Sequence, residues 1–278
     1  MGLIACPERD WIELDDRYRA EMAERRALLA TRRAEVFGAD AASVAARAET
    51  LALLAAHLPA RFPGWFEAAG ARLRNRLTGE TWNLDDPPDD PLIVAGLLVQ
   101  EDLCIVAPRD GAPVLAAAVL CFPSRWLLAD KLGRALSDVH GPVPGYGERL
   151  ARPVDRFMAS LKPGRIAARL NWSLLDDPAL FQPEGKFRDR LDPTITPENA
   201  PDRLWLRVER QTLRLLPASG AVLFGIRVHV YPLRRIVATP AIARRLAAAV
   251  AALPEATARY KSIAPFRAAL LAYVATQE

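Results

Sequence analysis

The sequence has 278 residues, of which 51% are hydrophobic and 25% charged, a composition that predicts a folded chain with a sizeable core rather than a disordered one. Its net charge of +4 comes from basic residues scattered along amphipathic segments, which favours solvated helix faces over a nucleic-acid-binding surface. The three cysteines (Cys6, Cys104 and Cys121) have no CxxC spacing and are too few for a four-thiolate cluster. The sequence has no signal-like N-terminus and no long apolar run, so we expect a cytoplasmic protein without a membrane span.

The first predicted elements are helices, between residues 15 and about 59. The stretch YRAEMAERRALLATRRAEVF is rich in helix formers, with apolar residues three and four positions apart. DAASVAARAETLALLAAHL follows, with Asp40 in the position of an N-cap. His57, near the end of this second helix, is expected to cap its C-terminus. These helices form an N-terminal extension of about residues 1–65 in a single domain that spans residues 1–278.

Strands dominate the middle of the chain. ARLRNRLTGETWNL predicts a short hairpin, and LIVAGLLVQEDLCIVAPRDGAPVLAAAVLCFP predicts two apolar strands around an Asp-Gly turn. RIAARLNWSLL, LWLRVERQTLRLLP and GAVLFGIRVHVYPL predict further strands, the last two joined across PASG. Helices are expected before residue 140, over about residues 145–161, and at the end of the chain, over about residues 239–276. This order predicts an α+β fold with an antiparallel sheet.

Familiar catalytic patterns are missing from the sequence. It contains no GxGxxG or GxxxxGK phosphate loop, no GxSxG elbow and no HExxH pair. Its three histidines are widely separated, so their spacing gives no support for a multi-histidine metal site.

His140 stands in the segment LSDVHGPVPGY, at the end of a predicted helix. Two prolines stiffen the loop that follows, and Gly141 is expected to adopt the left-handed conformation that ends a helix. The imidazole would therefore project from a rigid corner. That arrangement suits either a protonated imidazole that caps the helix or an axial ligand to a flat macrocycle, and spacing alone favours the cap.

Polar residues interrupt the apolar strands in two regions. Asn171 and Trp172, at an expected strand end, could stack on a ligand and hydrogen-bond it, or could form a capped turn with a core tryptophan. Glu209 interrupts a later strand, where a buried carboxylate needs an ion pair or a cavity. Two neighbouring strands are expected to bring together an acid, an amide, a guanidinium and an imidazole: Glu209, Gln211, Arg227 and His229.

Six segments, taken together, make the chain resemble a known family. They are WIELDDRY, LLVQEDLCIV, FPSRWLLADKLGRALSDVHGPVPGY, RLNWSLLDDPALFQP, LRVERQTLRLLPASGAVLFGIRVHVYPL and YKSIAPFRAALLAYV, spread from residue 11 to about residue 273. The family is that of the haem-dependent oxidative N-demethylase alpha subunit. The resemblance implies a PAS-like antiparallel sheet, flanked by N- and C-terminal helices, that encloses haem b. It also implies oxygen-dependent demethylation of a small secondary amine such as dimethylamine, with release of formaldehyde and electrons from a flavin and iron–sulfur reductase on a separate chain.

The resemblance also implies roles around the cofactor. His140 would be the axial ligand to the iron. Arg125, in PSRW, would bind a haem propionate, since a guanidinium and a carboxylate pair in a forked geometry. Asn171 and Trp172 would contribute to the cofactor site.

Glu209 would then hold a cationic amine, and Arg227 would orient dioxygen or a propionate. The chain departs from the family pattern at two positions. His229 stands where the family has an aromatic residue, usually tyrosine, and Gly225 where it has threonine, so the pocket and the amine could differ. His229 could compete with His140 as the iron ligand or lie distal to the iron. Two alternatives remain open from the sequence: a non-catalytic haem or small-ligand sensor of the PAS-like type, and a subunit that has lost its cofactor.

Overall fold

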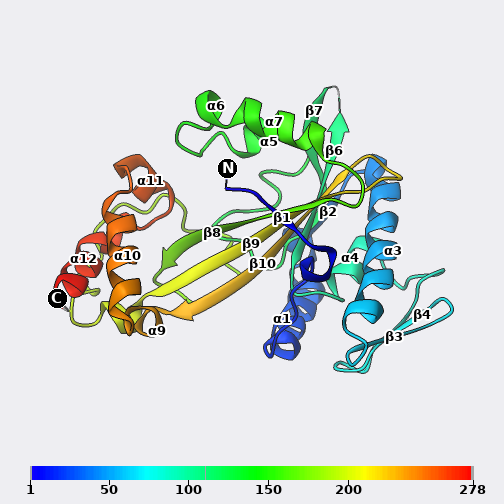
Figure 1. The fold of residues 1–278 in the computed structure, drawn as a ribbon, viewed down its shortest axis with the longest axis horizontal. Coiled ribbons are helices and arrows are strands. Elements are labelled where there is room, and N and C mark those ends of the chain that lie inside the picture. Colours follow the sequence, from blue (N-terminus) through cyan, green and yellow to red (C-terminus); the bar gives the residue numbers. More distant parts are fainter. Residues whose placement is uncertain (1, 110, 277–278) are drawn as a thin grey trace.

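A seven-stranded antiparallel sheet forms the centre of the computed structural model, which describes residues 2–109 and 111–276 (Figure 1). The strands follow the spatial order β1-β8-β9-β10-β6-β7-β2, so the three longest lie side by side. Their bounds are β1 (Ile4–Cys6), β2 (Phe37–Ala39), β6 (Asp102–Arg109), β7 (Ala112–Val119), β8 (Ile166–Leu175), β9 (Trp205–Leu215) and β10 (Val222–Pro232). The predicted α+β class with an antiparallel sheet is confirmed.

The hairpin of β9 and β10 determines which side chains share a face of the sheet. The two strands pair over eleven residues without a shift in register and are joined across residues 216–221, as the sequence predicts. Residues directly opposite one another share a face, and neighbours along a strand alternate. Glu209 is opposite Val228, whereas Arg210 is opposite Arg227. The Glu209 and Arg227 side chains therefore project from opposite faces.

Helices from the first third of the chain cover one face of the sheet and share its hydrophobic core (Figure 1). They are α1 (Tyr18–Thr31), α2 (Arg33–Val36), α3 (Val44–Arg61) and α4 (Pro91–Gly96), with a small sheet of β3 (Phe66–Ala69), β4 (Arg72–Asn75) and β5 (Thr81–Asn83). The predicted helices and short hairpin are confirmed, and Asp40 caps the turn before α3 by accepting a hydrogen bond from the Ala42 amide. The prediction that His57 caps α3 is wrong. The helix continues for another turn, and the His57 Nδ1 lies 3.4 Å from Glu8.

The apolar run LIVAG forms helix α4 rather than the start of a strand, so this part of the predicted hairpin is wrong. Asp90 accepts a hydrogen bond from the Leu92 amide, and Pro91 occupies the first helical position, which is a strong helix start. A short apolar run does not by itself distinguish a buried helix from a buried strand. The strand begins only at residue 102, and the predicted turn residue Asp110 lies outside the described residues.

Three short helices lie on the opposite side of the sheet from α1 (Figure 1). They are α5 (Leu136–Val139), α6 (Tyr146–Arg149) and α7 (Ala151–Ser160), so the helix predicted over residues 145–161 is broken at Leu150. Gly145, with φ of 71°, adopts the left-handed conformation in this region, and the prediction of that conformation for Gly141 is wrong. None of the α7 residues is fully buried. Its apolar side faces a space above the sheet.

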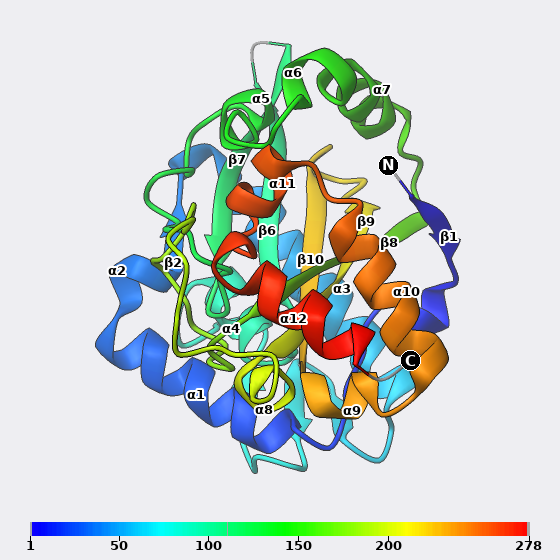
Figure 2. The same ribbon diagram turned by 90° about the vertical axis from the view of Figure 1, so that its left-hand side faces the viewer.

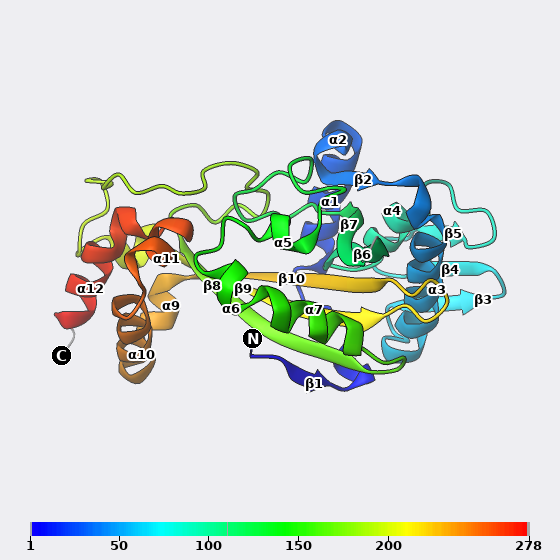
Figure 3. The ribbon, with the colours of Figure 1, turned by 90° about the horizontal axis from the view of Figure 1, so that it is seen from above.

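The remaining helices gather at one end of β8, β9 and β10, while α3 and the small sheet lie at the other end (Figures 2 and 3). They are α8 (Ala200–Arg203), α9 (Leu233–Val237), α10 (Pro240–Ala251), α11 (Glu255–Tyr260) and α12 (Arg267–Ala275). Helices α8, α9, α10 and α12 pack around a second hydrophobic core that includes Leu174 from the end of β8. The predicted C-terminal helices are confirmed. No helix in the described parts of the chain is long and apolar enough to cross a membrane.

Candidate functional site

A cavity of about 600 Å³ lies between the sheet, the α5–α7 segment and α11, and its volume is within the range of small-molecule and cofactor sites. Val106 and Phe224 form part of its floor on the sheet. Val154, Phe157 and Met158 of α7 form its roof. Met158 also packs against a small hydrophobic cluster that includes Val106 and Val222. The rest of the apolar side of α7 faces the cavity, which favours a ligand with an apolar body between roof and floor.

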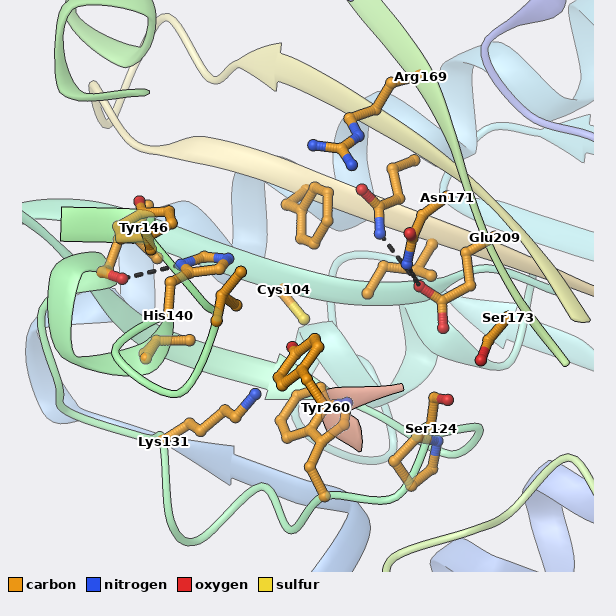
Figure 4. A pocket seen from close by; sticks show the side chains of 18 of the residues that line it. Cys104, Ser124, Lys131, His140, Tyr146, Arg169, Asn171, Ser173, Glu209 and Tyr260 are labelled. Atoms are coloured by element: carbon orange, nitrogen blue, oxygen red, sulfur yellow. Dashed lines mark hydrogen bonds between the residues drawn. The ribbon is translucent and has the colours of Figure 1, made fainter. Parts of the chain in front are cut away.

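His140 lines this cavity at the end of α5, and its ring is held in one orientation (Figure 4). Its Nδ1 lies 2.8 Å from the carbonyl oxygen of Leu136, and its ring stacks on Tyr146 with centroids 4.7 Å apart. A carbonyl only accepts, so Nδ1 carries the hydrogen and Nε2 keeps its lone pair. Burial lowers the pKa of His140, which favours this neutral form. The imidazole therefore caps a carbonyl through Nδ1 and leaves Nε2 on the cavity side as a potential metal ligand.

Arg125 lines the cavity as predicted and is almost completely buried. Its guanidinium pairs with Asp176 and donates to the Gln182 side chain at 3.3 Å. Its Nη1, also buried, has no hydrogen-bond partner. An unpaired buried donor is costly, so this atom fits a site for a carboxylate of a bound ligand.

Two lysines line the same cavity as Arg125 and have no carboxylate within salt-bridge distance among the described residues. The Lys131 Nζ lies 3.9 Å from the centre of the Trp126 ring, and the Lys186 Nζ lies 4.4 Å from that of Tyr260. Burial lowers the pKa of each to about 8, and the charge of Lys131 contributes to the shift at Lys186. Such a group of cations is stabilised by a ligand that carries negative charge.

Glu209 lines the cavity on the side opposite His140 (Figure 4). Its Oε2 accepts hydrogen bonds from Asn171 at 3.2 Å and Gln211 at 3.1 Å, and its Oε1 lies 3.4 Å from the Nε of Arg207. Burial raises the pKa of Glu209, but the Arg207 charge and these hydrogen bonds outweigh it and hold the pKa below its ordinary value. The carboxylate is therefore ionised at neutral pH, with both an ion pair and a cavity beside it.

Asn171 and Trp172 line the cavity as well, although β8 continues past them to Leu175, so their predicted position at a strand end is wrong. Asn171 connects two charged groups. Its Nδ2 donates to Glu209, and its Oδ1 accepts from the Lys261 Nζ at 3.3 Å. Lys261 also donates to the carbonyl of Trp172 at 2.5 Å, so the end of α11 is fastened to this wall.

The expected meeting of Arg227 and His229 with Glu209 in one polar set is wrong. The register places both on the far face, where Arg227 pairs with Asp15 at 2.6 Å and Glu21 at 2.8 Å. The His229 Nε2 lies 3.2 Å from Glu13 on the same face.

Gly225 also belongs to the far face. A Cβ at this position would lie 2.8 Å from the Thr212 Oγ1. Gly225 and His229, where the sequence was expected to depart from the family pattern, therefore lie behind the sheet and do not line the cavity.

The sequence did not single out the cavity lysines or Arg169, which also lines the cavity. One signal could have done so. The chain has four lysines among its 37 basic residues, and three of the four (Lys131, Lys186 and Lys261) line the cavity. The buried free thiol of Cys104 lines it too, in agreement with the expectation of a free cysteine in a strand.

The fold and the cavity define an α+β protein with a cofactor-sized site that combines an available imidazole nitrogen, unpaired cations and apolar walls. A model of the family described as haem-dependent oxidative N-demethylase, alpha subunit-like, matches residues 2–271. The chain belongs to this family, and the resemblance in its sequence segments is confirmed. No three His, Cys, Asp or Glu side chains of the described residues gather as a metal site, whereas a haem iron is held in the protein by as few as one axial side chain.

Proposed function

We propose that this protein is the haem-b-binding subunit of an oxidative N-demethylase, which removes a methyl group from a small secondary amine with O₂ and releases formaldehyde. The observation that carries the proposal is the His140 imidazole, neutral and hydrogen-bonded through Nδ1, with Nε2 free on the cavity side. Axial histidines in metal sites are oriented in this way by a hydrogen bond from their other nitrogen. Membership in the haem-dependent family supports the same assignment.

The residues of the cavity fit haem b. His140 would ligate the iron, and the apolar side chains of α7 and of the sheet floor would cover the macrocycle. Arg125, with its unpaired Nη1, would bind one propionate, and Lys131 and Lys186 would neutralise the other. Trp172 and Asn171 would complete the wall beside the cofactor.

When bound, haem supplies the oxidation of the N-methyl group by O₂. One secondary amine, one O₂, two electrons and two protons give one primary amine, one formaldehyde and one water. The residues of the chain bind and orient the amine, which is protonated at neutral pH. The Glu209 Oε2 accepts from both Asn171 and Gln211, whereas Oε1 accepts only from Arg207, at 3.4 Å, so Oε1 is the atom that would take an N–H of the ammonium group. Asn171 fixes the carboxylate and is itself fixed by Lys261.

The electrons would come from a reductase on a separate chain that carries flavin and iron–sulfur cofactors, which agrees with the family's designation as an alpha subunit. We further propose that the sheet and the helices around the cavity form one PAS-like haem domain over the length of the chain. The free, undisulfided cysteines support a location in the cytoplasm.

The test is an ultraviolet–visible spectrum of the purified protein, oxidised and dithionite-reduced, followed by an assay for amine-dependent formaldehyde with a reductase supplied. We expect a Soret band that shifts on reduction and formaldehyde in proportion to amine. Haem binding without formaldehyde would favour a sensor. A folded protein that takes up no haem would refute the proposal.

A further inference from the structure

The cavity holds a second group of cations, Arg169 and Lys261, on the Glu209 side of the site. Arg169 lies on β8, and its guanidinium projects into the cavity (Figure 4). Its Nε is buried without a hydrogen-bond partner, and its side chain has no ion-pair partner among the described residues. Lys261 reaches only neutral acceptors, the side chain of Asn171 and the carbonyl of Trp172. Burial lowers the pKa of Lys261, and the opposing charge of Glu209 offsets this only in part.

The strand register fixes the position of Arg169 relative to Glu209. Asn171 of β8 is opposite Glu209 of β9, and Arg169 is opposite Gln211 on the same face. Arg169 and Glu209 are thus diagonal neighbours, whose positions in an antiparallel pair are roughly 7–8 Å apart. A small ligand that carries both a positive and a negative group can therefore contact Glu209 with the first and Arg169 with the second, since both side chains line the same cavity.

The charge of the cavity also favours a ligand that carries both a positive and a negative group. The described lining holds one carboxylate, Glu209, and six cations: Arg125, Lys131, Arg169, Lys186, Arg207 and Lys261. Arg207 is paired with Glu209, and Arg125 with Asp176. The two haem propionates, held by Arg125, Lys131 and Lys186, would leave Arg169 and Lys261 without a counter-charge. A simple alkylammonium would add a further positive charge, whereas a substrate with its own carboxylate would offset one.

We propose that the substrate is an N-methyl amino acid, with its ammonium on Glu209 and its carboxylate on the guanidinium of Arg169. This inference rests on the proposed demethylase function and names its substrate class. For N-methylglycine, one O₂, two electrons from the reductase and two protons would yield glycine, formaldehyde and water. Arg169 forms a forked pair with the carboxylate, which satisfies its unpaired Nε and selects against amines without an acid group.

The experiment is isothermal titration of the haem-loaded protein with N-methylglycine, N-methylglycinamide and dimethylamine at one salt concentration and pH. We expect N-methylglycine to bind at least tenfold more tightly than its amide, which keeps the ammonium and lacks the carboxylate. Arg169→Gln is expected to abolish this preference, and Arg169→Lys to restore part of it. Arg165→Gln, which removes an exposed arginine just before β8, is the matched control and should keep the preference.

Equal affinity for N-methylglycine and its amide would overturn the inference, as would an unchanged preference in Arg169→Gln. If either result is found while dimethylamine still binds and yields formaldehyde, the substrate inference fails and the proposed demethylase function stands. A folded protein that takes up no haem would overturn both. Circular dichroism of each variant separates a lost contact from a lost fold.

Discussion

The Nδ1 atom of His140 lies 2.8 Å from the carbonyl oxygen of Leu136, one helical turn earlier in the chain. This contact selects the tautomer with a lone pair on Nε2, and stacking on Tyr146 holds the ring plane. Helix capping and metal ligation, which spacing presents as alternatives for this residue, are therefore compatible in a neutral imidazole.

His140→Ala is expected to lower haem affinity by at least tenfold and to change the Soret maximum of any haem that remains bound. The reason is loss of the only cavity imidazole among the described residues. His229→Ala removes an imidazole behind the sheet and should leave the spectrum unchanged. Haem titration followed at the Soret band measures both, and equal losses in the two variants would contradict the assignment of His140.

Glu209→Gln is expected to weaken binding of a secondary ammonium by about 10- to 100-fold, since a hydrogen bond to a charged group contributes roughly 1.5–3 kcal/mol. The folded-state pKa of Glu209 lies below its ordinary value, so the carboxylate is already ionised as the pH rises past about 4.3. Between pH 5.5 and 8 this residue should therefore add no pH dependence to amine affinity. A titratable step assigned to Glu209 in that range, by comparison with Glu209→Gln, would contradict the prediction.

Glu101 is a buried carboxyl behind the sheet, and its Oε2 has no hydrogen-bond partner. Burial raises its pKa to about 7. Between the unfolded value of about 4.3 and pH 7, the folded state binds more protons than the unfolded state, so its stability falls as the pH rises. Glu101→Gln lacks this loss and should be more stable than the parent by about 3 kcal/mol at pH 8.

The Glu101→Gln gain should fall to about 1 kcal/mol at pH 5 and nearly vanish at pH 3, where both the folded and the unfolded state of the parent hold most of the proton. Thermal or urea unfolding between pH 5 and 8 tests it. Glu148→Gln, which removes an exposed carboxylate from α6, is the control. A gain that does not change with pH would exclude titration of Glu101 as the cause.

Arg227→Met is expected to destabilise the fold by roughly 3–5 kcal/mol, because it leaves Glu21 and part of Asp15 without their counter-charge. Haem affinity per folded molecule should be unchanged, since Arg227 lies on the far face of the sheet. Chemical unfolding and haem titration of the folded fraction measure the two effects. A variant that loses haem binding but keeps normal stability would show that Arg227 does act at the cofactor.

Helix α7 has an apolar side but no fully buried residue, because Val154, Phe157 and Met158 face the cavity. Haem between α7 and the sheet would cover these side chains. We therefore expect removal of haem to increase hydrogen exchange of the α5–α7 amides at least tenfold, while α3, packed in the main core, is unchanged. Equal hydrogen-exchange rates in α5–α7 with and without haem would show that the cofactor does not contact α7.

The sequence by itself determines much of the architecture. Alternating side chains predict β8, β9 and β10, and apolar residues three and four apart predict α1 and α3, because these patterns depend only on local backbone geometry. The family and the rigid corner at His140 are likewise evident from local segments.

Tertiary structure decides which of the polar residues meet. A strand alternates its side chains, so the register alone sends Glu209 to the cavity and Arg227 to the ion pairs behind the sheet. Lys131, Lys186 and Lys261 come from three segments far apart in the chain, and no local pattern states that they line one cavity. The chemistry of the site is therefore a property of the packed sheet and its covering helices, since only folding brings these charges within reach of one ligand.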